Sequence, residues 1–181
     1  MGKTSSHLSS HHQSFINLQK MFFVATAPKE GFINLSPKGM GGFKIMDKKT
    51  VIWLNLTGSG NETAAHLLED ERMTIMFNAF EGNPMILRIY GKANAIHKRH
   101  PRWDAYIENF SYTKGARQII EVDIEMVQTS CGFGVPIMEY KQERKELTVW
   151  ANKKGEEGLN NYHREKNIQS LNGKQTGILE D

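Results

Sequence analysis

Residues 51–68 read VIWLNLTGSGNETAAHLL and contain the most informative change of pattern in this 181-residue chain. The first six residues are mostly apolar and typical of a buried strand, whereas the residues from Ala64 to Leu68 have helical spacing. Glycines and small polar residues separate the two patterns, as they do in tight connections. The sequence therefore predicts a strand that ends at Thr57 and a helix that follows it almost directly.

Ser59 and Glu62 have the S-x-x-E spacing of a capping box, which predicts that the helix begins beside Ser59. The first backbone N–H groups of a helix have no partner within the helix and carry partial positive charge. Gly58 and Gly60 lack the side chains that would hold a phosphate at a distance. This end of the helix is thus a candidate anion site.

Three neutral donors, Thr57, Asn61 and Thr63, belong to the same segment and would add hydrogen bonds to a bound phosphate. The alternative is an ordinary capped helix after a turn, which the segment alone does not distinguish. The spacing is neither that of a Walker loop nor G-x-G-x-x-G.

A second candidate segment, NLSPKG at residues 34–39, places Ser36, Pro37 and Lys38 at the end of an expected strand. The glycines that follow would permit close approach of a ligand. Lys38 would supply positive charge to the phosphate, and the alternative is a lysine that is merely solvated.

Short extended segments dominate the rest of the chain. Hairpin signals join two pairs of them, and Ile120–Met126 alternates apolar and acidic residues so regularly that one face is expected to be wet. A bend or bulge is expected at Gly91. The expected strands are Phe22–Ala25, Phe32–Leu35, Phe43–Met46, Val51–Leu56, Arg72–Phe77, Ile86–Ala93 and Ile120–Met126.

Few helices accompany these strands: a short one over Phe15–Met21, one over His100–Phe110 and a charged helical tail from Tyr140. At least six strands with few helices predict a mainly β fold, and closure into a barrel removes exposed sheet edges. Residues 1–12 are expected to form a flexible N-terminal segment, and residues 13–181 a single domain.

Composition limits the classes of partner that are expected. The formal charge of +3 is small and scattered, which argues against nucleic acid, and no apolar run approaches the length of a membrane span. Cys131 is the single cysteine, so a reducing, cytoplasmic setting is expected. His97 and His100 form H-x-x-H without a third ligand at a recognisable spacing, so no metal site is predicted.

Five segments in this order resemble the pyridoxamine 5′-phosphate oxidase-related proteins, and more narrowly the branch with NLSPKG and GSGNET. The resemblance covers about Phe15 to Asn172. The segments are FFVATA (22–27), INLSPKG (33–39), WLNLTGSGNET (53–63), MILRIYGKA (85–93) and SCGFGVP (130–136).

This resemblance implies a split β-barrel homodimer that holds flavin mononucleotide (FMN) at the subunit interface. It assigns phosphate or ribityl contacts to five residues and places Ser36 and Pro37 along the flavin. Arg88, on the polar face of a strand, would reach the flavin, a substrate carboxylate or a surface acid. The five assigned residues are Lys38, Thr57, Ser59, Asn61 and Thr63.

The sequence departs from true pyridoxamine 5′-phosphate oxidases at two places. Gly60, Asn61 and Glu62 stand where the resemblance leads one to expect a Ser-Arg-Lys phosphate clamp, and the C-terminal segment lacks an Arg-x-His element. Oxidation of vitamin B6 is therefore not expected.

Three functions remain open at this point. The first is a flavin-dependent oxidoreductase of unknown substrate, in which the cofactor performs the redox chemistry. The second is a non-catalytic flavin carrier or sensor. The third keeps the split barrel with a deazaflavin or haem as the ligand.

Overall fold

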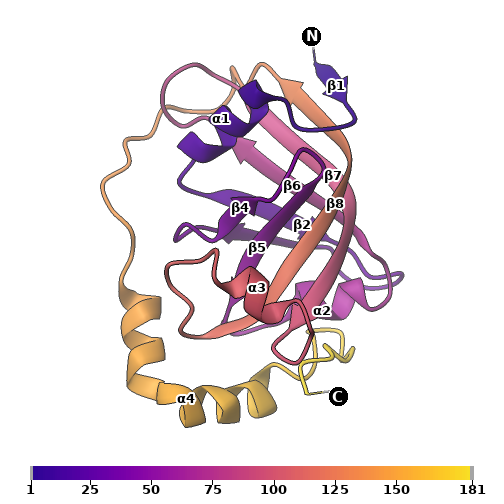
Figure 1. The fold of residues 1–181 in the computed structure, drawn as a ribbon, viewed down its shortest axis with the longest axis vertical. Helices are drawn as coiled ribbons and strands as arrows, with labels where there is room; N and C mark the ends of the chain where they lie inside the picture. Colours follow the sequence, from indigo (N-terminus) through magenta and orange to yellow (C-terminus); the bar gives the residue numbers. More distant parts are fainter. Residues whose placement is uncertain (1, 180–181) are drawn as a thin grey trace.

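The computed structural model describes residues 2–179 as a strongly curved sheet of eight antiparallel strands (Figure 1). Seven strands follow the order β3-β2-β6-β7-β8-β5-β4, and β1 pairs with β8 beside this path. The edge strands β3 and β4 do not pair with each other, so the barrel is open on that side. The strands are β1 (Lys3–Ser5), β2 (Phe22–Thr26), β3 (Asn34–Lys38), β4 (Phe43–Ile45), β5 (Thr50–Leu56), β6 (Arg72–Asn78), β7 (Ile86–His97) and β8 (Ala116–Ser130).

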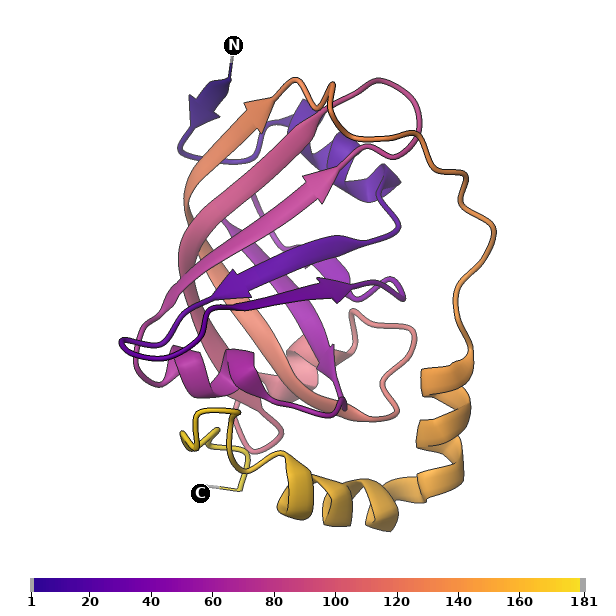
Figure 2. The same ribbon diagram turned by 180° about the vertical axis from the view of Figure 1, so that it is seen from behind.

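Four helices flank the sheet. Helix α1 (Ser10–Leu18) lies at one end of the barrel, whereas α2 (Glu62–Leu67) and α3 (Trp103–Ile107) lie at the other, where α4 (Glu146–Lys166) also arrives (Figures 1 and 2). The mainly β fold with flanking helices is thus confirmed. Among residues 2–179, none of the helices has the length and apolarity that crossing a bilayer requires.

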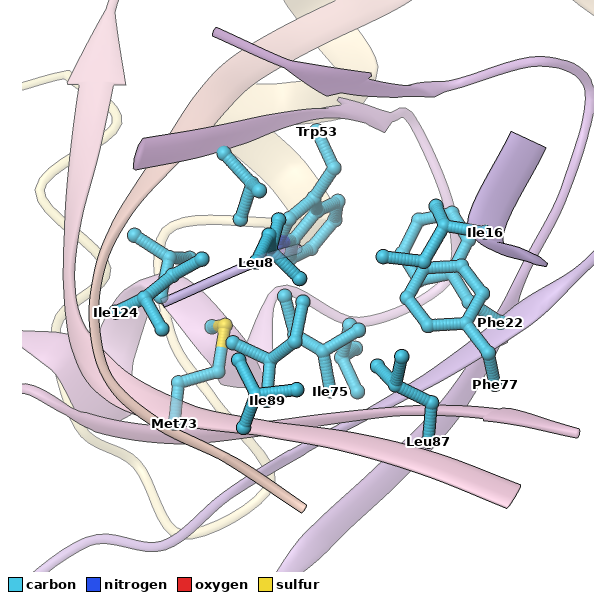
Figure 3. Packing of buried hydrophobic residues seen from close by; sticks show 14 of the residues in the cluster. Leu8, Ile16, Phe22, Trp53, Met73, Ile75, Phe77, Leu87, Ile89 and Ile124 are labelled. Carbon is cyan, nitrogen blue, oxygen red and sulfur yellow. The ribbon is translucent and has the colours of Figure 1, made fainter. Parts of the chain in front are cut away.

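The main core fills the inside of the curved sheet. Trp53, Phe22 and Phe77 are nearly or completely buried, and Ile16 of α1 packs among them (Figure 3). The Phe22 and Phe77 rings stack with their centroids 5.5 Å apart. These aromatic contacts hold β2, β5 and β6 together, and thereby fix the strand ends at which the candidate site lies.

The bulge expected at Gly91 is present, because the register between β7 and β8 shifts between Tyr90 and Gly91. A Cβ atom built on Gly91 would lie 2.1 Å from the carbonyl oxygen of Asp123, so only glycine fits there. The shift also changes which residues of β8 face inward. Val127 is buried and Met126 is partly exposed, contrary to simple alternation.

The expectation of one wet face along Ile120–Met126 holds only for its later half. Glu121 is buried because α3 covers this part of β8, and its carboxylate accepts hydrogen bonds from Arg102 and Tyr106, each at 2.5 Å. A second apolar cluster, which includes Trp103 and Ile119, lies between α3 and the sheet.

The structure places a short strand and a buried leucine in residues 1–12, the segment that the sequence predicts to be flexible. Strand β1 pairs with β8, and Leu8 is completely buried in the main core. Ser9 caps α1 by accepting from the backbone N–H of His12. The periodicity of this polar stretch does not reveal the buried leucine or the helix cap. Met1 lies outside the described residues.

The charged tail is helical, as expected, but α4 begins at Glu146 rather than near Tyr140. Residues 131–145 form an arm without helix or strand that leads from β8 to α4 (Figure 2). Gly155 has a φ of 67°, which breaks α4 into two parts that meet at a bend. The bend brings the second part of α4 beneath the barrel, next to the loop after β5.

Candidate functional site

Helix α2 begins at Glu62, with Asn61 at the N-cap position, so the predicted start beside Ser59 is wrong. Ser59 is exposed and does not cap the helix. The Glu62 carboxylate instead accepts from the backbone N–H of Leu171 at 2.9 Å. The Glu62 side chain therefore contacts a residue that is distant in sequence and does not form the predicted capping box.

A cavity of about 480 Å³ lies between the end of β3 and the loop that joins β5 to α2. It brings together both segments that the sequence identified, with nine of the ten predicted site residues on its wall. These nine are Ser36, Pro37, Lys38, Thr57, Gly58, Ser59, Gly60, Asn61 and Thr63.

Arg88 is the predicted residue that does not line this cavity. It lies on β7 opposite Met76 and Gln128, and its guanidinium donates to the Ser130 hydroxyl at 3.5 Å. A contact between Arg88 and the cofactor therefore stays a prediction.

Lys38 enters the cavity from the end of β3. Its ammonium lies 5.2 Å from the centre of the Trp53 ring, and the side chain is half-buried. Burial, with a smaller effect of the nearby Arg117 charge, lowers the pKa of Lys38 to about 8. No carboxylate within the described residues forms an ion pair with it. Lys38 is thus a partly buried cation with no carboxylate partner among residues 2–179.

Arg117, at the start of β8, is a second buried cation in the cavity wall, and sequence reasoning missed it. It is 5% exposed and donates to the Gly60 carbonyl at 2.7 Å and to the Asn167 side-chain oxygen at 2.8 Å. Both acceptors are neutral, and the buried Nε atom has no partner among the described residues. Burial lowers the pKa of Arg117 to about 10, so it remains charged near neutral pH.

Thr57 lines the cavity, but its donors are already used. Its backbone N–H and its hydroxyl both donate to the Gly115 carbonyl, each at 2.7 Å. The Thr57 hydroxyl oxygen lies 2.8 Å from Nε2 of His163 on α4, which therefore acts as the donor in that pair. Thr57 thus positions the loop and the helix, and its contact with a phosphate stays a prediction.

Asn167, which follows α4, joins the parts of the site and was also missed. Its side-chain amide donates to the Gly58 carbonyl at 3.1 Å, while its side-chain oxygen accepts from Arg117. Its backbone carbonyl accepts from Asn61 at 3.4 Å and from Thr176 at 2.6 Å. Asn167 is completely buried, so these bonds hold the loop after β5 in one conformation.

Several donors in the cavity remain available to a ligand. The backbone N–H groups of Gly58, Ser59 and Gly60 have no acceptor within the part of the chain that the structure describes. Glu62 is the one acidic residue on the wall, and its two oxygens are directed at Leu171 and towards His66, the latter 4.0 Å away. Two cations and open amides therefore favour a phosphate or another strong anion.

The residues that were missed carry little local signal. Arg117 and Asn167 lie 57 and 107 positions beyond Gly60 (117 − 60 and 167 − 60), and no motif connects them to the loop. Only the pairing of β5 with β8 brings Arg117 close, by placing Gln118 opposite Asn55. The one signal in the sequence is Arg117 itself, a charged residue that lies two positions after Gly115 at the start of a long strand pattern.

Comparisons with solved structures agree with the open barrel. HupZ of Group A Streptococcus superimposes with a TM-score of 0.53 at 19% identity, over 66% of this chain and 91% of that one. A putative pyridoxamine 5′-phosphate oxidase from Lactobacillus delbrueckii gives a TM-score of 0.54 at 15% identity, over 68% of this chain and 94% of that one. At these identities the likeness shows the fold alone.

Comparison with protein sequences identifies relatives as well as the fold. The protein ustO of Aspergillus flavus, described as a pyridoxamine 5′-phosphate oxidase family protein, is 39% identical over 137 residues, or 73% of this chain and 55% of that protein. The chain thus spans about half the length of this curated relative. The family model described as pyridoxamine 5′-phosphate oxidase matches residues 8–131, which include β2 to β8 and both segments of the cavity wall. The chain belongs to the pyridoxamine 5′-phosphate oxidase family.

Proposed function

We propose that this protein binds FMN through its 5′-phosphate in the cavity between β3 and α2, and that it is a flavin-dependent oxidoreductase. The observation that carries the proposal is the pair Lys38 and Arg117. Two cations in one cavity wall repel each other and lack carboxylate partners among the described residues. A bound dianion relieves both costs, since it pairs with each cation.

The residues of the cavity fit the cofactor in chemistry and in space. The open amides of residues 58–60 would hold the phosphate oxygens, together with Lys38 and Arg117. Ser36 and Pro37 line the wall next to Lys38, where the rest of the cofactor would extend. When bound, the flavin supplies hydride transfer, and the protein supplies anchoring, orientation and a water-poor surrounding.

A homodimer is part of the proposal. The edge strand β3 is unpaired on one side among the described residues. Leu35 on this strand is 66% exposed, and Phe32 and Ile33, which precede the strand, are exposed to a similar degree. An exposed apolar edge of this kind is a typical place for a second copy to pack. Symmetric packing of two copies would cover the open side of each barrel.

The absorbance spectrum of the purified protein, followed by mass spectrometry of the molecule released by heat, tests the cofactor. We expect flavin bands and FMN. A haem or deazaflavin spectrum, or a colourless protein that fails to bind added FMN, would contradict the proposal. Reduction of the bound flavin by NADH or NADPH would then favour an enzyme over a carrier or sensor, because a carrier needs no access for a reductant.

A further inference from the structure

A larger cavity, of about 1230 Å³, lies on the other side of Lys38. Helix α1 and the residues 19–21 that follow it form one wall, and the turn between β6 and β7 forms another. Residues 138–147, from the end of the arm and the start of α4, form the third. The family model ends at residue 131, so this third wall lies outside the region that the family model describes.

The wall of this cavity is largely apolar, and parts of it are open to water. Leu18 and Met138 line this open cavity and are 71% and 52% exposed. A molecule that removes these side chains from water is stabilised in proportion to the apolar area that it covers. The principal apolar residues are Phe15, Leu18, Met21, Phe80, Met85 and Met138.

The arm is held over the cavity by few contacts. The backbone N–H of Met138 donates to the Phe80 carbonyl at 3.0 Å, and that of Tyr140 donates to the Glu81 carboxylate at 3.0 Å. The Lys20 ammonium lies 5.6 Å from the Tyr140 ring. These contacts fix the arm without filling the space beneath it.

The two cavities meet. Pro37, Lys38 and Gly39 at the end of β3 line both, as do Met40 and Leu147. In the proposed arrangement, the part of the cofactor beyond its phosphate extends along Ser36 and Pro37, and Pro37 belongs to this shared wall. A molecule in the larger cavity would lie next to that part of the cofactor.

Charge also limits what the larger cavity holds. Three acidic residues, Glu81, Glu139 and Glu143, balance the basic residues Lys20, Lys38 and Arg144. The proposed function assigns Lys38 to the phosphate of the cofactor, so the rest of the wall offers no excess of positive charge to a phosphorylated substrate. The volume, by contrast, exceeds the range of about 300–1000 Å³ that is usual for small-molecule sites.

We propose that the larger cavity is the substrate site and that it takes a neutral, bulky and largely apolar molecule. The inference rests on the proposed function, because it places the substrate beside the flavin. It also distinguishes this chain from enzymes that act on phosphorylated B6 vitamers, which need a second anion site.

Menadione, a neutral bicyclic quinone, is a suitable probe. Titration into the FMN-loaded protein should perturb the flavin spectrum and give a dissociation constant, whereas pyridoxamine 5′-phosphate should not bind at this site. Met138→Arg places a charge in the cavity while it keeps the backbone hydrogen bond of residue 138, and should weaken menadione binding by about tenfold or more. Ile137→Arg is the matched control, because Ile137 is 90% exposed and does not line the cavity.

Equal menadione affinity in the wild type and both variants would overturn the inference. The inference would also be overturned if pyridoxamine 5′-phosphate binds and Met138→Arg weakens its binding as much as it weakens menadione binding. If menadione does not bind and Met138→Arg dissociates a dimer, the inference is also overturned, because a second copy of the chain then fills the cavity. Retention of FMN is measured separately, and calorimetry with menadione on flavin-free protein tests the cavity even if the proposed cofactor is wrong.

Discussion

At the scale of single residues, the candidate site depends on charges rather than on the helix end that first suggested it. Helix α2 has six residues and no side-chain cap, so its dipole is a weak source of anion affinity. Lys38 and Arg117 supply full charges where the local sequence offers only neutral donors. In the proposed function, the segment GSGNET is therefore a frame around the phosphate, and the charges that bind it come from two other strands.

Lys38→Ala should weaken FMN binding much more than riboflavin binding, because only FMN carries the phosphate. A charge-assisted contact contributes about 1.5–3 kcal/mol, which corresponds to roughly ten- to a hundredfold in affinity. Fluorescence titration with both flavins measures the effect. Lys48→Ala, at an exposed position, is the control and should leave both affinities unchanged. Equal losses for the two flavins would make Lys38 a structural residue.

The pKa of Lys38, lowered to about 8 by burial, predicts the pH dependence of binding. Above that pH the free protein loses the lysine charge, so FMN affinity should fall as the pH rises from 7 to 9.5. Riboflavin affinity should stay nearly constant. In the flavin-free protein the lowered pKa has the opposite effect on stability, because the unfolded chain binds more protons between pH 8 and 10.5 and folding is favoured as the pH rises.

The profile of Lys38→Ala is the control for this titration. It should be flat over the same range for FMN, and its free energy of unfolding should lack the rise above pH 8. A wild-type FMN profile without a decrease would mean that Lys38 stays charged throughout or does not face the phosphate.

Asn167→Asp tests whether the residue that joins the site acts on the anion. The new carboxylate would lie where the amide oxygen accepts from Arg117, at 2.8 Å, and would neutralise that cation. FMN affinity should fall by about tenfold or more, as for loss of one charged contact, while riboflavin affinity changes little. Asn160→Asp, exposed on α4, is the matched control. A parallel loss of both flavins and of thermal stability would assign Asn167 a structural role alone.

At the scale of elements, the sequence predicts the parts that repeat and misses the parts that depend on long-range contacts. The two hairpins and the bulge at Gly91 follow from turn residues and alternation, which are local. The start of α2 does not, because Leu171 takes the Glu62 carboxylate from 109 residues away. The role of α4 also escapes local patterns, since Leu147 near its start lines the cavity and His163 near its end contacts Thr57.

Gly91→Ala tests the bulge that couples β7 to β8. The added Cβ would lie 2.1 Å from the Asp123 carbonyl oxygen, so the strands must separate or the register must change. We expect a loss of about 3 kcal/mol in the free energy of unfolding, at the upper end of overpacking effects. Urea denaturation measures it, with Gly134→Ala as control because nothing lies within 4 Å of a Cβ atom there. A loss no larger than that of the control would mean that the bulge adapts easily.

At the scale of the whole molecule, the open barrel explains why the cavity wall is built from distant segments. The end of the edge strand β3 and the loop that leads from β5 into α2 line the same cavity. The second part of α4 closes this end from below (Figure 2). The C-terminal segment therefore completes the site, and one side of the edge strand β3 pairs with no other strand among the described residues.

The proposed homodimer predicts a mass of twice 20.6 kDa in sedimentation equilibrium. Leu35→Lys places a charge on the exposed apolar edge of β3 and should shift the protein towards the monomer. Val149→Lys is the control, since Val149 is 61% exposed on α4 and away from that edge. If the second copy covers the open side, the monomeric variant should also release FMN faster. A dimer that withstands Leu35→Lys would place the interface elsewhere, and a wild-type monomer that retains FMN would show that one chain holds the cofactor by itself.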